Sequence, residues 1–127
     1  MSASTSNSKP WADQPLALIP TPAFLTKHHN MWISEASHMR NVHNVIFRGY
    51  NSIYLQAPYV QEADMDAFLG YCRVWCKLVT THAEEEERHY FPEAEMLLGE
   101  RVFEQTHEEH DTFMPLLQAF QQYLNSL

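Results

Sequence analysis

The sequence predicts an all-α fold in which an extended, proline-rich arm precedes three long helices. Apolar residues recur at steps of three and four along three long stretches, as they do on the buried face of a helix. Only three glycines are present, too few for the many tight turns of an all-β fold. With 127 residues, 45% of them hydrophobic, the chain is long enough for one globular domain with a modest core.

The arm is expected to occupy residues 1–30. Ser and Thr crowd its start, and four prolines exclude a long helix: Pro10, Pro15, Pro20 and Pro22. Four apolar side chains favour contact with a surface groove: Trp11, Leu16, Leu18 and Ile19. We therefore divide the chain into an arm over residues 1–30 and a helical bundle over residues 31–127.

The first long helix is predicted from about Ser34, as the N-cap, to about Gln56, just before Ala57-Pro58. Its apolar stripe comprises Met39, His43, Ile46, Phe47, Tyr50, Ile53 and Tyr54.

The second helix is predicted from about Asp64 to Tyr90, with Pro92 as its stop and a short turn over residues 92–98. Its stripe comprises Phe68, Tyr71, Cys72, Trp75, Leu78, Val79, His82, Glu86 and Tyr90.

The third helix is predicted to begin after Gly99 and to run to the end of the sequence, with a kink at Pro115. Its stripe comprises Phe103, His107, His110, Phe113, Met114, Leu117, Phe120 and Leu124.

Charge and cysteine content narrow the function classes. A net charge of −8 disfavours nucleic acid as a partner, because no basic stripe is available to neutralise phosphates. The sequence contains no apolar run of 18 residues, so no membrane span is predicted. The N-terminus lacks the pattern of a secretory signal. Cys72 and Cys76 lie four apart in a helical pattern, which indicates buried, reduced thiols and a cytoplasmic protein.

Candidate metal ligands lie on the buried stripes. A buried imidazole needs a compensating partner, and each stripe carries a histidine: His43, His82 or His110. His82 and Glu86 are four apart, so both can reach one metal from one helix face. Such a pair alone is more often a surface ion pair, and a lone histidine is more often a core residue. Three stripes that each carry a histidine favour a metal site.

The remaining polar candidates are assigned lesser roles. His28, His29, His38 and His89 are expected on the surface, and Glu84 and Glu85 are expected to be solvated. His107 is expected as a reserve ligand or as a donor to a ligand. Glu87 is expected to contact the metal ligands and not the metal itself.

Four segments together resemble the hemerythrin-like (HHE cation-binding) family in its fungal form: KPWADQPLALIPTP, VHNVIFRGYNSIYLQAPYV, VWCKLVTTHAEEEERHYFP and THEEHDTFMPLLQAF. The resemblance covers nearly all of residues 9–125. It implies an up-down four-helix bundle around a non-haem di-iron centre that holds O2 or senses iron, oxygen or redox state. It also implies His43, His82, Glu86 and His110 as metal ligands, with Glu86 as a bridging carboxylate.

The sequence departs from the family pattern in three places. Ala83 follows His82 where the family often has a second histidine, and Met114 stands where a second ligand of the third helix is common. The fourth helix is not apparent before Leu127, so the bundle is expected to be short at its C-terminal end. The groove left by this helix is expected to be covered by the arm, by a second copy of the chain or by another partner. Four inward candidates are fewer than a complete di-iron centre uses.

The leading functional hypothesis is binding of iron, mononuclear or dinuclear, for O2 binding, for redox or iron sensing, or for storage; other divalent metals also suit the ligands. One alternative is a metal-free bundle that acts as an interaction or structural module. Another is a di-iron oxidative enzyme completed by a partner chain, although the sequence indicates no substrate pocket or catalytic base.

Overall fold

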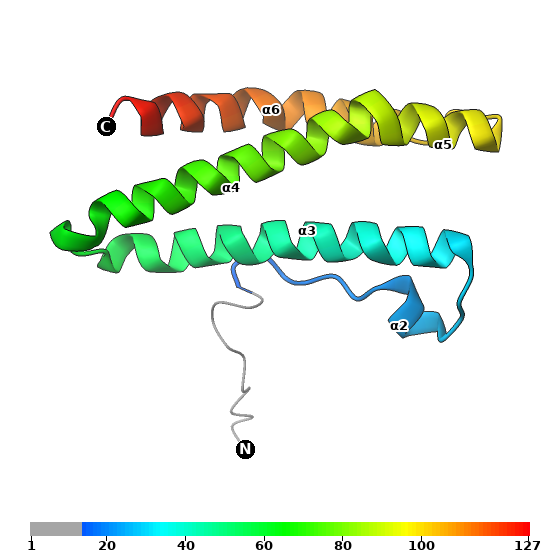
Figure 1. The fold of residues 1–127 in the computed structure, drawn as a ribbon, viewed down its shortest axis with the longest axis horizontal. Helices are drawn as coiled ribbons and strands as arrows, with labels where there is room; N and C mark the ends of the chain where they lie inside the picture. The colour runs from blue at the N-terminus through cyan, green and yellow to red at the C-terminus, as the bar shows by residue number, and fades with distance from the viewer. Residues whose placement is uncertain (1–13) are drawn as a thin grey trace, which may run out of the picture. The chain divides into compact units, whose positions relative to one another are not determined.

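The computed structural model describes residues 14–127, and every regular element in that range is helical (Figure 1). The all-α prediction is therefore confirmed for the described residues. Chain contacts divide the protein into two compact units, residues 1–64 and residues 65–127, and each is described by itself. No helix within the described range is both long and apolar enough to cross a lipid bilayer.

The first unit is built on α3, Met31–Gln56. Its N-cap is Asn30, whose side-chain oxygen accepts a hydrogen bond from the Ile33 amide at 2.9 Å. The predicted N-cap, Ser34, is wrong because its own amide already donates to the Asn30 carbonyl, one turn inside the helix. Two short 3₁₀ turns, η1 (Ala57–Tyr59) and η2 (Glu62–Asp64), follow α3.

In residues 14–30, the described part of the arm, one short helix forms: α2, Pro22–Thr26. Pro22 occupies the first turn, where its missing amide has no helical partner to lose, and the Thr21 hydroxyl caps the Phe24 amide. No long helix forms in the described part of the arm, as predicted. Trp11 lies outside the described residues. The division at residue 30 stays a prediction.

A polar ladder on α3 holds the arm by its backbone. This ladder consists of Ser37, Asn44 and Asn51, which lie seven residues apart on one helix face. The Asn51 amide oxygen accepts from the Leu16 amide at 2.8 Å, and its nitrogen donates to the Leu16 carbonyl at 2.9 Å. Asn44 forms the same pair with Ile19, both at 2.8 Å. The Ser37 hydroxyl accepts from the Ala23 amide at 3.0 Å.

The second unit contains α4 (Met65–Glu85), the π-helical turn η3 (Glu86–Tyr90), α5 (Phe91–Leu98) and α6 (Glu104–Asn125). Within this unit α6 returns beside α4 in the opposite direction (Figure 1). The predicted stop at Pro92 is wrong, and so is the predicted turn over residues 92–98. Pro92 lies in the first turn of α5, where a proline needs no donor.

The π turn explains how the chain passes this proline. The Phe91 amide donates to the Glu86 carbonyl, five residues back, instead of to a carbonyl four residues back. Pro92 has no amide to donate, and its ring would crowd the carbonyl of Arg88 in a regular α-helix. The wider turn relieves that crowding, and the helical path continues to Gly99, whose left-handed backbone (φ 72°) ends α5.

The buried face of α4 is rotated relative to the predicted stripe. Its buried residues, with those of η3, are Cys72, Cys76, Val79, Ala83 and Glu86. Tyr71 and Leu78 were expected on this face but are exposed, at 48% and 39%. The buried line includes small side chains, those of Ala83 and of the free thiols Cys72 and Cys76, which suits the close contact between α4 and α6. Burial raises the pKa of both thiols, which keeps them neutral in the core.

The facing residues of α6 follow the prediction more closely. Leu117 and Leu124 are buried, and Phe113, Met114 and Phe120 are half-buried. Arg73 of α4 donates from Nη2 to the Leu124 carbonyl at 2.9 Å, placing a positive charge at the C-terminal end of α6, where the helix dipole favours it. The helix continues through Pro115, and its predicted kink stays a prediction.

Candidate metal centre

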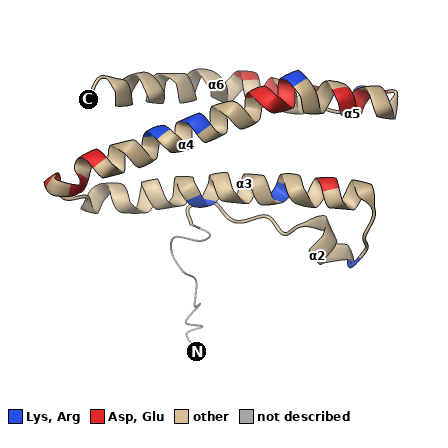
Figure 2. Ribbon diagram, in the orientation of Figure 1, with Lys and Arg blue, Asp and Glu red and all other residues tan. Residues whose placement is uncertain are grey.

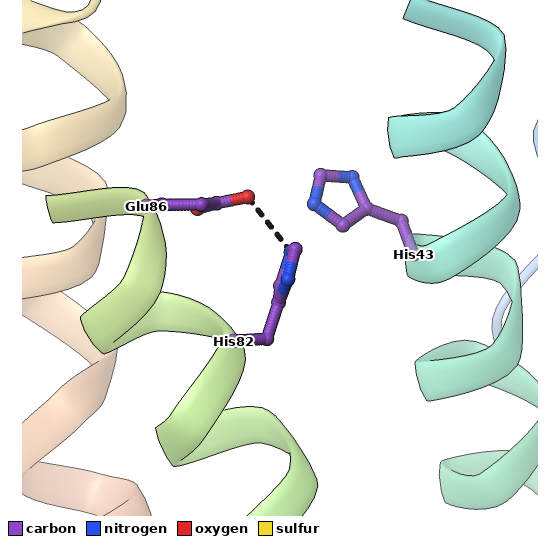
Figure 3. Close-up of side chains that lie close together, drawn as sticks. All are labelled: His43, His82 and Glu86. Atoms are coloured by element: carbon purple, nitrogen blue, oxygen red, sulfur yellow. Dashed lines mark ion pairs between the residues drawn. The ribbon is translucent and has the colours of Figure 1, made fainter. Parts of the chain in front are cut away.

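Glu86 is the centre of the candidate site. It is the first residue of the π turn and is only 3% exposed. One carboxylate oxygen, Oε1, lies 2.7 Å from Nε2 of His82, one turn earlier on α4, and Figure 3 shows this contact as a dashed line. A buried carboxylate is costly unless positive charge or donors surround it, so this position demands partners of the kind that His82 supplies.

The second oxygen of Glu86 faces α6. Its Oε2 lies 3.1 Å from Nε2 of His110. Glu86 therefore has an imidazole nitrogen beside each of its two oxygens: that of His82 from α4 and that of His110 from α6. Two ligand atoms bound at right angles to one ion at about 2.1 Å lie about 3 Å apart. Both spacings in the site approximate that value.

Glu87 contacts the His110 ring through the nitrogen that does not face Glu86. Its Oε1 lies 2.7 Å from Nδ1 of His110, and its Oε2 lies 2.7 Å from Nδ1 of His107. Burial of Glu87 opposes its ionisation, but the hydrogen bonds from His107 and His110 outweigh burial and hold the pKa of Glu87 below its usual value. In return, the hydrogen bond to Glu87 and the charges of Glu87 and Asp111 raise the pKa of His107. The expected supporting role of Glu87 thus has a structural basis.

Aromatic rings hold the His110 imidazole from two sides. Phe91 stacks near it, with ring centres 5.8 Å apart and an angle of 24° between the planes. Phe113, one turn further along α6, meets it edge to face at 5.5 Å. Phe103 stacks in turn on Phe91 at 4.5 Å. These contacts leave the ring little freedom to rotate and shield it from water.

The comparison with known families accounts for this arrangement. The family model described as "Hemerythrin HHE cation binding domain" matches residues 35–127. The chain belongs to the hemerythrin HHE cation-binding family. The "Dimeric xanthone biosynthesis cluster protein R11" of Cryptosporiopsis sp. (strain 8999) is 33% identical over 99 residues, which are 73% of this chain and 37% of that protein. The chain thus spans little more than a third of this relative's length. No solved structure matches the chain.

The family ligand positions divide between the two units. His82, Glu86 and His110 lie together in the second unit. His43, also drawn in Figure 3, belongs to α3 of the first unit, where it is half-buried on the predicted stripe. Its role as a ligand stays a prediction. The surface positions predicted for His28, His29, His38 and His89 are confirmed, because all four are exposed.

The departures from the family pattern also have structural counterparts. Ala83 is buried on α4, at 4% exposure, where an imidazole would need room that close packing denies. Met114 is half-buried on α6, one turn after His110. This hemerythrin-family chain therefore offers packing side chains at two positions where the family often has ligands.

Acidic side chains surround the candidate centre. Figure 2 shows Asp and Glu gathered where α4 passes into the π turn. Glu84 and Glu85 of this run are exposed, as predicted, and Glu86 is buried. Their combined negative potential attracts cations. Imidazole nitrogen and carboxylate oxygen are donors that suit iron or zinc, so the types of residue gathered around Glu86 fit a metal ion.

Sequence reasoning missed the aromatic walls of the site. Phe91 and Phe113 were assigned to no functional role, although Phe113 lies three residues after His110 and therefore on the same helix face. That spacing could have identified it. Phe91 could not be found in this way, because its approach to His110 depends on the π turn that the sequence analysis did not predict.

Proposed function

We propose that this chain binds non-haem iron through Glu86, His82 and His110, with His43 of α3 as a further ligand. The observation that carries the proposal is the buried Glu86 carboxylate, with the Nε2 atom of one imidazole beside each oxygen. Membership of a cation-binding family supports it independently. The negative charge of Glu86 would offset part of the charge of the ion, and the imidazoles would donate neutral nitrogen atoms.

Iron held by such ligands supplies reversible one-electron chemistry and a position for O2, so we further propose O2, redox or iron sensing, or iron storage, as the role. The residues of the chain define what surrounds that position. Phe91 and Phe113 exclude water from the His110 side, and Glu87 accepts a hydrogen bond from Nδ1 of His110. Ligand access to the metal would be governed by these side chains.

The direct test is metal stoichiometry. The purified chain is loaded with Fe(II) without oxygen, excess metal is removed, and iron per chain is measured by mass spectrometry. Glu86→Gln should lose most of the bound iron, because a neutral amide is a poor substitute for a carboxylate ligand. His43→Ala and His110→Ala should also lower occupancy, whereas His38→Ala, an exposed histidine on α3, serves as the matched control. Equal iron content in wild type and Glu86→Gln would overturn the proposal.

The proposed O2 role has its own measurement. Near-ultraviolet absorbance of the iron-loaded chain should change on exposure to O2, and the change should reverse when O2 is removed. Iron content without any response to O2 would leave iron binding or storage and remove O2 sensing.

One observation favours a metal-free interaction module as the second candidate. Each imidazole at the centre already has a carboxylate partner within 3.1 Å, so the cluster can satisfy its own hydrogen bonds and charges. Melting temperatures that do not change with any divalent metal would support this candidate.

An oxidative enzyme is the third candidate, and the name of the relative favours it. That protein is named for a dimeric xanthone biosynthesis cluster. Continuous O2 consumption by the iron-loaded chain in the presence of a phenolic substrate and a reductant would support an enzyme. Binding of O2 without turnover would argue for sensing.

A further inference from the structure

We propose that Glu87 is a positioning residue that fixes the orientation and the proton of His110, so that Nε2 of His110 is presented to a metal at Glu86; this inference rests on the proposed metal-binding function. The juxtaposition that carries it is a single carboxylate that contacts Nδ1 of both His107 and His110 at 2.7 Å.

The proton follows from the chemistry of the partners. An ionised carboxylate only accepts hydrogen bonds, so the His110 nitrogen that faces Glu87 must carry the proton. A neutral imidazole has one N–H and one lone pair. In the metal-free chain Nε2 faces the Glu86 carboxylate at 3.1 Å and can donate to it. On metal binding, His110 would keep the Nδ1 proton that Glu87 accepts and offer the lone pair of Nε2 to the ion. Contacts of this kind behind a metal-binding histidine set its tautomer and ring orientation.

The π turn makes this arrangement available. Glu86 and Glu87 are adjacent, and in an α-helix adjacent side chains point about 100° apart. The i→i+5 hydrogen bond of η3 places more residues in the turn, so that adjacent side chains point in more similar directions. Both carboxylates consequently reach the same residue, His110 of α6, one from each side of its ring.

His107 holds the carboxylate in turn. It lies one turn before His110 on α6 and contacts the other oxygen of Glu87. Its side chain is 57% exposed, whereas that of His110 is 12% exposed. Because His107 contacts one oxygen of Glu87, the carboxylate is held in one rotation. Its other oxygen then holds the ring of His110.

The test compares Glu87→Ala with Glu85→Ala, a matched change at an exposed carboxylate of the same helical run. Two properties are measured: Zn²⁺ affinity by competition with a chromogenic chelator, and the His110 Nδ1 proton by ¹⁵N-edited NMR of the metal-free chain. We expect Glu87→Ala to weaken Zn²⁺ binding about 10–100-fold and to lose the hydrogen-bonded Nδ1 proton. Glu85→Ala should match wild type in both. Glu87→Gln keeps an acceptor oxygen and should restore most of the proton signal.

The two readouts separate this inference from the proposed function. If wild type binds no metal but Glu87→Ala loses the Nδ1 proton, metal binding fails and the positioning contact stands. If wild type binds Zn²⁺ and Glu87→Ala binds it equally with an unchanged Nδ1 proton, metal binding stands and the role of Glu87 is overturned. If Glu87→Ala does not fold, Glu87→Leu, which also has no acceptor oxygen, takes its place: unchanged affinity and an unchanged Nδ1 proton in that variant would overturn it.

Discussion

At the scale of single residues, the site is organised by two adjacent carboxylates with different tasks. Glu86 is buried and faces one nitrogen of each of two imidazoles, whereas Glu87 is half-buried and contacts the rear nitrogen of His110. The same residue type thus serves as a candidate ligand at one position and as a support at the next. The difference arises from direction and burial alone.

Titration of His107 should report the pair that it forms with Glu87. Its raised pKa means that the charged pair stabilises the fold below the ordinary imidazole value of about 6.5 and that this contribution is lost as the pH rises through the raised pKa of His107. At the acid end, the contribution is lost as the pH falls through the lowered pKa of Glu87. NMR titration of the metal-free chain should show the His107 pKa decreasing in Glu87→Gln and unchanged in Glu85→Gln. An identical His107 titration in all three proteins would contradict the pairing.

At the scale of elements, α3 has two kinds of buried contact. Its predicted apolar stripe is largely half-buried, and its buried residues are instead Ser37, Gly49 and Asn51, two of which bind the arm backbone. A polar side chain that pairs with both the N–H and the C=O of one residue satisfies two backbone groups at once. The arm is therefore fixed in register by polar residues that a search for apolar stripes passes over.

Replacement of Asn51 should measure the strength of this attachment. Asn51→Leu keeps the approximate shape of the side chain but leaves the Leu16 amide and carbonyl without their partner, so the free energy of unfolding should fall by about 1–3 kcal/mol. Urea denaturation gives the value. Asn41→Leu, at an exposed asparagine of the same helix, is the control and should change stability by less than about 0.5 kcal/mol. Equal effects of the two substitutions would show that the ladder contributes little.

The parts of this structure that the sequence predicted are those governed by a repeating pattern. The three long helices and the inward positions of His82, Glu86 and His110 all follow from 3.6-residue periodicity. The path past Pro92 could not be predicted in this way, because a π turn shifts the register of every later residue and has no periodic signal. The rotation of the buried line toward Cys76 and Ala83 also depends on which neighbour packs there, a choice that one helix does not reveal alone.

At the scale of the whole molecule, the small core means that a bound metal would be a substantial source of stability. The buried apolar side chains of the second unit are few, and several are small: Cys72, Cys76, Val79, Ala83, Phe91, Leu117 and Leu124. A ligand that binds only the folded state stabilises it by mass action, by about 2.7 kcal/mol at a concentration 100 times its dissociation constant. Metal binding and folding are therefore expected to be linked in this chain.

Melting temperatures with and without metal should reveal that link. Excess Fe(II) or Zn²⁺ should raise the melting temperature at pH 7.5. The increase should disappear below about pH 6, because imidazole ligands must be deprotonated to bind and ordinarily protonate near 6.5. Glu86→Gln should show a much smaller increase, and His38→Ala should behave like wild type. A metal-induced increase of the same size at pH 5 would exclude imidazoles as the ligands.

The π turn also has a consequence for chain length. It accommodates one residue more than a regular α-helix would between α4 and α5. Deletion of Arg88, which is exposed within the turn, should convert it to an α-helical turn while α5 keeps its orientation. Deletion of Lys77, equally exposed but within α4, should instead turn every later residue by about 100° and remove His82 and Glu86 from the buried line. Thermal unfolding should show the Arg88 deletion moderately destabilised, because the Pro92 ring then crowds the carbonyl of Glu87, and the Lys77 deletion destabilised more strongly. A one-residue change in length, as much as a substitution, can thus determine how many carboxylates reach the His110 ring.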